Sequence, residues 1–343
     1  MATNSDNEPL HLAVKRGQLE RVRELLDSGT KPDIKDIHHR TPLMIAADYG
    51  YTEIAKLLIE RGADINAKSR RSEVWEGRCT PLFNACEAGR HLVVKLLLES
   101  GADPDCISQS WFTPLSNAIL GKKKQIVDYL LEHGANPNGP AKCFMSPLES
   151  AATNNDVVMV KDLLQRGADP NRIGGTGGTA LAATNSLECA SELLVAGADS
   201  NLKNRDGLTV LQSRLLVIGP EFVSALIKAG ANVNETSEAS GITPLLFLAM
   251  TPRFDNAQIL IEAGADVNAL SHDGKTPLDI CEIMLTRAND DIVRSQATVN
   301  ALRQDNGRDL ADKIQKDIGM KIGACKSMIN LLQQHGGKRA KDL

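Results

Sequence analysis

The sequence lacks a long run of apolar residues and a strong excess of charge. Its longest apolar stretch lies around Ile242–Met250 and is far shorter than the roughly 20 residues that a membrane-spanning helix needs. The formal net charge of the 343 residues is −4, and the sequence pI is about 6.0. General binding to nucleic acid or to an anionic membrane requires a basic surface, which this balance does not provide. We therefore expect no membrane and no general nucleic-acid partner.

Cysteine pairs of the kind that hold metal ions are also missing. The seven cysteines are an odd number, and no two of them stand in a Cys-x-x-Cys spacing. We interpret them as reduced thiols and expect no zinc site. The first ten residues, MATNSDNEPL, are polar and lack the apolar core of a secretory signal. We expect an intracellular, reducing location in the cytoplasm or nucleus; for a bacterial protein, delivery into a host cell is the alternative.

No catalytic set can be defended from the sequence. The recurring Asp and Asn residues of GADIN, GANPN and GADVN suit a structural role, because short polar side chains bond to the backbone of a turn. The segment IGGTGG, Ile173–Gly178, looks like a phosphate loop but lacks the Lys-Ser/Thr of that motif. The adjacent His38 and His39 have no further ligands with which to bind a metal. We expect no enzymatic activity, no cofactor and no metal.

One pattern is repeated throughout the chain and is clearest in residues 41–66, TPLMIAADYGYTEIAKLLIERGADIN. Thr41 suits a helix N-cap, and Pro42 suits the first helical position, where no intrahelical N–H is needed. Apolar residues then recur three and four positions apart on two short helices, which Gly50 separates and Gly62 ends. Such short helices are not stable alone, so each must bury its apolar stripe against a neighbouring copy.

The pattern recurs with a period close to 33 residues. Its leading Thr-Pro-Leu position is found at Thr41, Thr80, Thr113, Ser146, Thr179, Thr209, Thr243 and Thr276. The glycine that ends each second helix is found at Gly29, Gly62, Gly101, Gly134, Gly167, Gly197, Gly230 and Gly264. A repeat of this length predicts a solenoid, in which each unit packs only on its neighbours.

These segments resemble the ankyrin repeats. The resemblance rests on TPLMIAADYG…LLIERGADINA, TPLFNACEAG…LLLESGADPD and TPLLFLAM…LIEAGADVNALSHDGKTPL, covers residues 8–281 and returns at KSMINLLQQHGG. It implies an all-α solenoid of about nine helix-turn-helix repeats with short β-hairpin fingers between them. It also implies a non-enzymatic adaptor, scaffold or inhibitor that binds another protein on its concave groove.

The register divides the chain into three expected parts. Residues 1–34 form an N-terminal capping repeat, whose charged residues suit a face without a neighbour. Residues 35–275 hold repeats two to eight, of which the sixth is three residues short and has a shortened first helix. Residues 276–343 hold a ninth repeat with a helical insertion that forms a C-terminal cap. An apolar stripe along 310–332 predicts a long amphipathic helix there.

Two glycines on this predicted helix, Gly319 and Gly323, have two interpretations. They are either incidental or the mark of an oligomerisation seam that brings helix backbones close together. We favour the first and expect a monomer.

The fingers of the early repeats depart from the family pattern, which has a glycine at the finger tip because a positive φ there costs other residues energy. The later fingers keep this residue, at Gly177, Gly207, Gly241 and Gly274. In the earlier fingers the register places other residues there: His39, Arg78, Trp111 and Phe144.

Aromatic residues concentrate on the same fingers: Trp75, Trp111, Phe112 and Phe144. One interpretation is finger-to-finger packing, aromatic on aromatic, in place of the lost glycines. The other is an exposed anchor for a partner protein, a role in which Trp and Tyr are common. Tyr49 lies late in the first helix of repeat two, a position that faces the concave groove in ankyrin folds, and it favours the second interpretation.

We therefore predict a partner-binding surface on the groove and fingers of repeats two to five. Its residues are Tyr49, Trp75, Arg78, Trp111, Phe112 and Phe144. The alternative is a small nucleotide-like ligand that stacks on the finger aromatics. Charge for such a ligand would come from Arg78, Lys142 and Lys122–Lys124.

Overall fold

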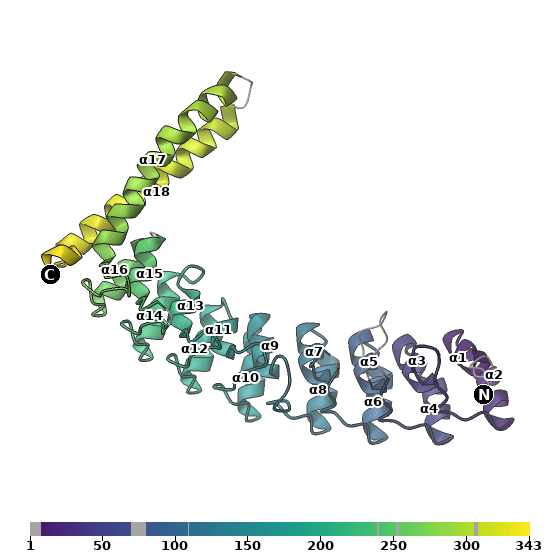
Figure 1. The fold of residues 1–343 in the computed structure, drawn as a ribbon. Helices are drawn as coiled ribbons and strands as arrows, with labels where there is room; N and C mark the ends of the chain where they lie inside the picture. The colour runs from purple at the N-terminus through teal and green to yellow at the C-terminus, as the bar shows by residue number, and fades with distance from the viewer. Residues whose placement is uncertain (1–7, 70–79, 109, 239, 252–253, 305–307) are drawn as a thin grey trace. The chain divides into compact units, whose positions relative to one another are not determined.

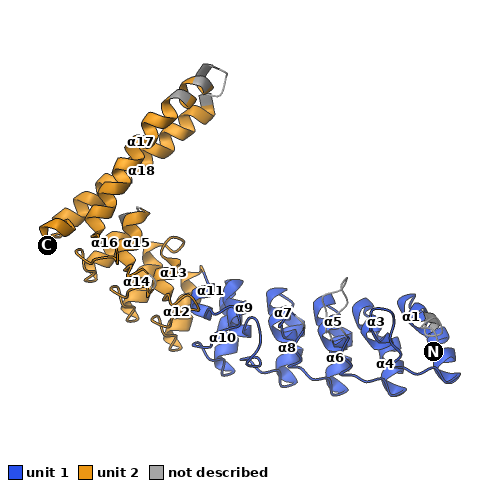
Figure 2. Cartoon of the chain, viewed as in Figure 1, with its two compact units in different colours: residues 1–184 blue, residues 185–343 orange. Residues whose placement is uncertain are grey.

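The computed structural model describes residues 8–69, 80–108, 110–238, 240–251, 254–304 and 308–343 (Figure 1). In these ranges the regular secondary structure is helical, and no strand is formed. The chain divides into two compact units, residues 1–184 and residues 185–343 (Figure 2). The boundary falls within the short sixth repeat, directly after a first helix of only four residues.

Unit 1 consists of two layers of short helices. The first helices of successive pairs pack on one another in one layer: α1 (Glu8–Lys15), α3 (Pro42–Tyr49), α5 (Pro81–Ala88), α7 (Pro114–Leu120), α9 (Pro147–Thr153) and α11 (Ala180–Ala183). The second helices form the other layer: α2 (Leu19–Asp27), α4 (Thr52–Glu60), α6 (His91–Glu99), α8 (Lys124–Glu132) and α10 (Val157–Gln165). The two layers confirm the all-α solenoid expected from the repeat.

Unit 2 begins with the same kind of helix and ends with a different one. Its short helices are α12 (Leu187–Val195), α13 (Val210–Arg214), α14 (Pro220–Lys228), α15 (Pro244–Met250) and α16 (Phe254–Glu262). They are followed by α17 (Pro277–Gln304) and α18 (Arg308–Gln334), which have 28 and 27 residues and lie side by side as a long helical hairpin (Figure 1). A short 3₁₀ turn, η2 (Ala340–Asp342), follows.

Hydroxyl caps start the first helices where the sequence predicts them. Thr41 has an extended backbone, and its Oγ1 accepts a hydrogen bond from the Met44 N–H while Pro42 fills the first helical position. The same side-chain cap is made by Thr80, Thr113, Ser146, Thr179, Thr209, Thr243 and Thr276. All eight glycines expected to end second helices have a positive φ. The predicted register is therefore confirmed.

The first helices are the inner layer of the stack. In α3 every residue from Pro42 to Ala47 is buried, whereas α4 buries the stripe that contains Ile54 and Leu58. Burying one leucine or isoleucine stabilises the fold by roughly 1.5–3 kcal/mol. A short helix buried all round must be covered on both sides, so each first helix depends on the copies before and after it.

Asparagine side chains tie several repeats to the next at the turn that follows the second helix. The Asn138 amide donates to the Gly167 carbonyl at 3.1 Å, and its oxygen accepts from the Asp169 N–H at 2.6 Å. The same pair of bonds is made by Asn66, Asn201, Asn234 and Asn268. The recurring Asn and Asp residues of the GADIN-like segments are thus structural, as predicted.

These asparagine bonds, here called the asparagine ladder, show where the long hairpin enters the repeat pattern. Asn268 bonds to the Gly336 carbonyl and the Lys338 N–H, which are 68 and 70 residues away in the chain. The corresponding bonds of Asn138 span 29 and 31 residues. Because α17 packs on α15 and α18 packs on α16, the hairpin supplies both helices of a last repeat. The extra residues therefore lie between its first and second helix, at the far end of the hairpin.

The long helix predicted along residues 310–332 is present as α18, and a second long helix, α17, packs against it. The predicted stripe is buried at Cys325 and Leu332, while Leu310 is 52% exposed. The partner of this stripe is α17, which continues to Gln304 instead of ending after two turns as the earlier first helices do. No atom would lie within 4 Å of a Cβ added at Gly319 or Gly323, so neither glycine lies in a close contact between the two helices.

The asparagine ladder predicts a graded response at Asn138. Asn138→Ala removes a donor and an acceptor and should lower the free energy of unfolding by about 1 kcal/mol. Asn138→Asp keeps the acceptor oxygen and should lower the free energy of unfolding by less. Asp105 makes such an acceptor bond in another repeat, where it accepts from the Asn136 N–H at 2.9 Å. Urea unfolding followed by circular dichroism measures both. Equal losses in the two variants would contradict the proposed role of the acceptor.

Candidate functional site

The fingers of unit 1 are tight turns that precede the first helices. In Ser108–Phe112 the Ser108 N–H donates to the Phe112 carbonyl at 2.9 Å, and the Trp111 N–H donates to the Ser108 carbonyl at 3.0 Å. Asp36–Arg40 and Gly174–Gly178 are closed by the same two bonds. Because two bonds do not make a ladder, these segments are tight turns, and no strand of the expected β-hairpin fingers forms in the described residues.

The backbone shows which finger residues replace a glycine. His39 has φ 57° and Trp111 has φ 61°, so both take the left-handed conformation predicted for them. Phe144 does not have a positive φ, and its predicted place at a finger tip is wrong. In that finger the turn comes earlier: Gly139 has φ 64°, and the Cys143 N–H donates to the Pro140 carbonyl at 3.1 Å. Arg78 lies outside the described residues.

Three successive fingers are joined by backbone hydrogen bonds. The Phe144 N–H donates to the Trp111 carbonyl at 2.6 Å, and the Thr176 N–H donates to the Phe144 carbonyl at 3.0 Å. The Gly175 N–H also donates to the Cys143 carbonyl at 3.1 Å. The fingers at 108–112, 139–144 and 174–178 therefore form one connected strip, here called the finger row. Its backbone positions are fixed from finger to finger.

The segment that resembles a phosphate loop is one end of this row. A Cβ at Gly175 would lie 2.9 Å from the Cys143 carbonyl oxygen and from the Phe144 Cα, so only glycine allows the contact. Thr176 Oγ1 donates to Glu149 Oε1 at 2.6 Å, and Glu149 is 4% exposed. Burial raises the pKa of Glu149, and hydrogen bonds from Thr176 and Ser146 oppose that rise. The glycines thus serve the packing of one finger on the next.

The finger aromatics divide between the two interpretations. The rings of Phe112 and Phe144 pack against each other, with centroids 5.4 Å apart and planes at 60°. Trp111 is 52% exposed, and no aromatic ring among the described residues contacts it. Phe144 packs and is still 42% exposed. The packing interpretation therefore holds for Phe112, whereas the Trp111 ring is exposed as the partner-anchor interpretation expects.

Tyr49 lies apart from the finger row. It is the last residue of α3, whereas the fingers precede the first residues of these helices. Eight helical residues span about 12 Å. The Tyr49 ring stacks on the Tyr51 ring, with centroids 5.6 Å apart and planes at 10°. The structure thus does not bring Tyr49 together with Trp111, and Trp75 lies outside the described residues.

Two exposed apolar residues on fingers were missed in the sequence. Ile37 is 75% exposed in the finger Asp36–Arg40, and Ile173, directly before the finger at 174–178, is 48% exposed. Each is an apolar residue within an otherwise polar or glycine-rich segment, DIHHR and RIGGTGG. That contrast is the sequence signal for these two residues.

The lysines of residues 122–124 lie at the opposite end of α7 from its finger. Lys123 Nζ donates to the carbonyls of Cys86 and Glu87 at 2.9 and 2.7 Å, which places a cation at the C-terminal end of α5. Lys124 lies 3.9 Å from the Asp128 carboxylate on its own helix. Lys123 therefore has a structural role, and none of the three lysines lies beside the finger row.

A partly buried carboxyl lies beside Tyr49 at the end of α3. Asp48 is 34% exposed, and its carboxylate is 3.9 Å from Arg40 Nη1. Burial raises the pKa of Asp48 to about 6, although Arg40 and Asn84 favour its charged form. Arg90 Nε donates to the Asp48 backbone carbonyl at 3.0 Å and so links two repeats.

The metal-ligating side chains and thiols of the described residues bear on the expectations of no metal site and of reduced thiols. Among them no three His, Cys, Asp or Glu side chains could hold a metal ion together. Burial raises the pKa of Cys106 to about 11 and that of Cys281 to about 12, so both thiols are protonated and unreactive at neutral pH. In the same ranges there is no helix with the length and hydropathy to span a membrane.

Comparison with known proteins identifies the repeat. A family model described as ankyrin repeats (3 copies) matches residues 2–69, 82–174 and 178–271. The chain belongs to the ankyrin-repeat family. This confirms the resemblance inferred from the sequence. Ankyrin repeats are in general modules for protein–protein interaction, and the fold is typically a non-enzymatic scaffold.

Known ankyrin-repeat proteins match parts of the chain. It is 37% identical over 73 residues to an ankyrin repeat-containing protein of Schizosaccharomyces pombe, a match covering 21% of this chain and 34% of that protein. It is 41% identical over 73 residues to a poly [ADP-ribose] polymerase tankyrase of Caenorhabditis elegans, a match covering 20% of this chain and 3% of that protein. These matches span about a third or less of the curated relatives.

Among solved structures, the ankyrin repeat domain of human ASB11 is similar to this chain. The TM-score is 0.52 at 28% identity, over 65% of this chain and 98% of that one. This similarity supports the same repeat architecture.

The finger row predicts that Gly175 cannot carry a side chain. Gly175→Ala should lower the free energy of unfolding by about 1–3 kcal/mol, because the added methyl group meets backbone atoms at 2.9 Å. Gly319→Ala is the matched control: this exposed helical glycine has no atom within 4 Å, and alanine should leave stability equal or raise it by up to about 1 kcal/mol. Thermal unfolding measures the change in stability of the Gly175→Ala and Gly319→Ala variants relative to the wild type. An unchanged Gly175→Ala variant would show that the fingers are not in close contact.

Asp48 predicts a pH dependence of stability. Its raised pKa means that the folded state holds a proton between about pH 4 and pH 6 that the unfolded state releases, so stability falls as the pH rises through this range. Asp48→Asn should therefore be more stable than the wild type at pH 7.5, by at most about 1 kcal/mol after solvent screening. The difference should vanish at pH 4 in melting curves. A difference that does not change with pH would refute the raised pKa.

Proposed function

We propose that the protein binds a partner protein on the finger row of unit 1 and acts as an adaptor or inhibitor without enzymatic activity. The observation that carries this proposal is the half-exposed Trp111 on a finger whose backbone is fixed by the next finger. A large exposed aromatic on a rigid element suits an interface anchor, because little conformational entropy is lost when the partner binds.

The chemistry of the row indicates what the partner presents to it. Exposed apolar surface comes from Trp111 and Phe144 on neighbouring fingers and from Ile173, directly before the next finger. Ile37, on another finger of unit 1, is also exposed. An apolar centre with a polar rim is the usual anatomy of a protein interface. We propose a partner with an apolar patch that covers the Trp111 ring.

Tyr49 belongs to this proposal only as a second contact. It is 42% exposed and lies at the other end of the first-helix layer from the fingers. A partner that reaches both would have to lie across the inner helices. Trp75 and Arg78 remain predictions from the sequence.

The alternative of a nucleotide-like ligand has less support. Stacking on Trp111 would suit it, but the lysines of 122–124 lie at the far end of α7, and Lys123 is bonded to two carbonyls. Lys142 is the exposed cation within the fingers of the row. A phosphate would therefore find little charge beside the exposed ring.

Three further expectations remain proposals. We propose that residues 1–34 cap the stack at its N-terminal end, that residues 35–275 hold repeats two to eight, and that residues 276–343 form the C-terminal cap. We also propose a monomer and an intracellular, reducing location.

Affinity capture from lysate with Trp111→Ala tests the proposal. Because the ring is half exposed, this variant should keep the wild-type melting temperature and lose its partner, with an affinity reduced about 30-fold or more. Phe144→Ala should lose the contact with Phe112 and melt earlier as well. The matched control is Leu92→Ala on α6, an apolar residue that is 57% exposed in the same unit.

The control separates a specific site from general surface hydrophobicity. Leu92→Ala should retain every captured partner. If Trp111→Ala retains all partners at wild-type strength, the finger row is not the binding site. Salt-sensitive binding of a mononucleotide to the wild type, lost in Trp111→Ala, would favour the alternative ligand.

A further inference from the structure

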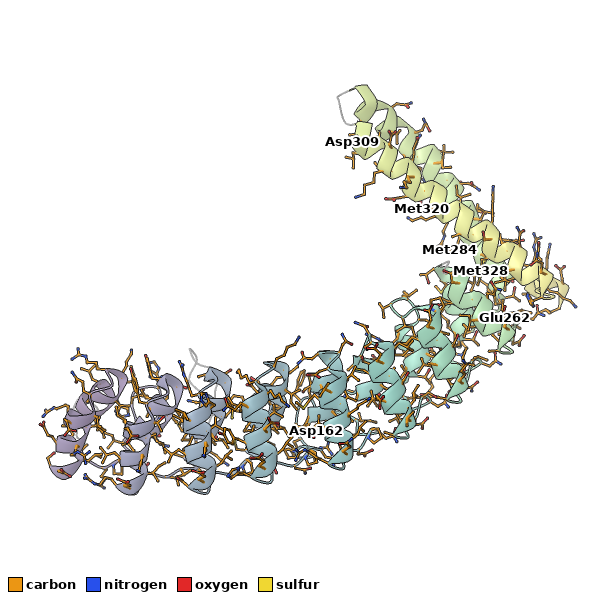
Figure 3. All side chains as sticks on the ribbon, turned by 180° about the vertical axis from the view of Figure 1, so that it is seen from behind. Asp162, Glu262, Met284, Asp309, Met320 and Met328 are labelled. Atoms are coloured by element: carbon orange, nitrogen blue, oxygen red, sulfur yellow. The ribbon has the colours of Figure 1, made fainter. Side chains whose placement is uncertain are left out.

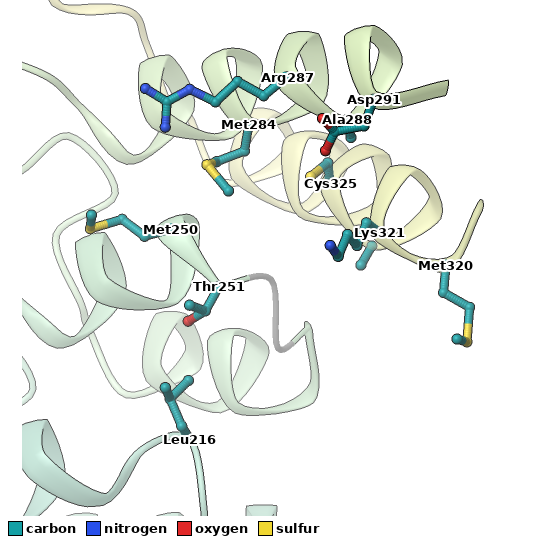
Figure 4. A pocket seen from close by; sticks show the side chains of 11 residues that line it. Leu216, Met250, Thr251, Met284, Arg287, Ala288, Asp291, Met320, Lys321 and Cys325 are labelled. Atoms are coloured by element: carbon teal, nitrogen blue, oxygen red, sulfur yellow. The ribbon is translucent and has the colours of Figure 1, made fainter. Parts of the chain in front are cut away.

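A groove in unit 2 lies where the long hairpin meets the ends of the short helices. It has a volume of about 660 Å³. Its lining comes from the segment after α13, the end of α15 and one face of the hairpin: Leu216, Met250, Thr251, Met284, Arg287, Ala288, Asp291, Met320, Lys321, Ala324 and Cys325 (Figure 4). Most of this lining is apolar. The hairpin wall is the part that has no counterpart in the other repeats.

Three methionines from three helices line this groove. Met250 ends α15 and is 43% exposed, while Met320 on α18 is 57% exposed. Met284 comes from α17, and Figure 3 shows both Met284 and Met320 on the hairpin. Methionine is flexible and polarisable, so it adapts to the shape of an apolar partner, and it is frequent on surfaces that bind helices. Exposed side chains of this kind favour a binding surface over a packed core.

The wall that α17 contributes is straight and continuous. Met284, Arg287, Ala288 and Asp291 stand at i, i+3, i+4 and i+7, which is one face of the helix over two turns, about 10 Å. On α18 the lining residues are Met320, Lys321, Ala324 and Cys325, over about one and a half turns. A groove between a helical wall of this length and the ends of the short helices accommodates a helix that presents apolar side chains three and four residues apart.

Two cations on the hairpin wall, one from each of its helices, indicate the charge of the occupant. Arg287 projects from α17 and Lys321 from α18, and within the described residues neither forms an ion pair. Asp291 is the single acidic residue of the lining. Unpaired cations on the rim attract acidic side chains and disfavour basic ones, which contributes more to the choice of partner than to total affinity.

We propose that this groove binds an amphipathic helix of a partner protein, with an apolar stripe on the three methionines and acidic residues on its flanks. The site is separate from the finger row, so one protein could hold two partners. The proposal does not depend on the function proposed for unit 1.

Two synthetic helical peptides test the proposal directly. Both have about 14 residues, four turns, with the same leucine stripe; one has glutamate on its flanks and the other lysine. Methionine methyl resonances of the labelled full chain report the site, assigned with single Met→Leu variants. The glutamate peptide should shift Met250, Met284 and Met320, leave Met44 and Met159 of unit 1 unchanged, and bind at least about fivefold more tightly than the lysine peptide.

Charge reversal supplies the matched comparison. Arg287→Glu combined with Lys321→Glu should invert the preference between the two peptides. Arg294→Glu combined with Lys313→Glu is the control, because these exposed residues lie on the same helices outside the groove and should leave the preference unchanged. Trp111→Ala should bind the peptides as the wild type does, which distinguishes this site from the finger row.

Three results would overturn the proposal. The first is the absence of shifts at the three methionines with either peptide at millimolar concentration. The second is binding without a preference for acidic flanks. The third is displacement of both peptides by a small uncharged apolar compound that itself binds tightly, which would identify the groove as a small-molecule site.

Discussion

The fold depends on one constraint: no repeat can bury its apolar residues alone. In α3 every residue from Pro42 to Ala47 is buried, so this helix needs cover from α1 on one side and α5 on the other. Each first helix is too short to be stable by itself. Stability is therefore shared between neighbouring copies, and the caps, glycine stops and asparagine bonds all serve to keep successive copies in the same register.

The same constraint bears on where an exposed side chain can lie in unit 1. The helical layers use most of their apolar side chains for packing between repeats, as the buried residues of α3 show. The fingers precede the first helices and pack mainly on one another, as the bonds from Phe144 to Trp111 and from Thr176 to Phe144 show. A large residue on a finger can therefore stay exposed without cost to the core, and Trp111 does so at 52% exposure.

The long hairpin shows where such a repeat tolerates insertion. The packing of α17 on α15 and of α18 on α16 holds one end of the hairpin, and the bonds from Asn268 to Gly336 and Lys338 close the repeat. The extra residues of this repeat extend both helices, which have 28 and 27 residues. The extension creates a wall beside α15 that no regular repeat has, and with it a methionine-lined groove.

The sequence by itself determined the repeat, its register and most of its local structure. Thr-Pro starts, glycine stops, the left-handed His39 and Trp111, and the shortened α11 all follow from residue type and spacing, because caps and positive φ values are local properties. Only the tertiary structure decided which finger aromatics pack and which stay exposed, that Phe144 is not at a finger tip, and that Tyr49 lies apart from Trp111. It also decided that the last insertion makes a hairpin of two long helices. These features depend on contacts between residues distant in the chain, such as Asn268 with Gly336, and no local pattern encodes them.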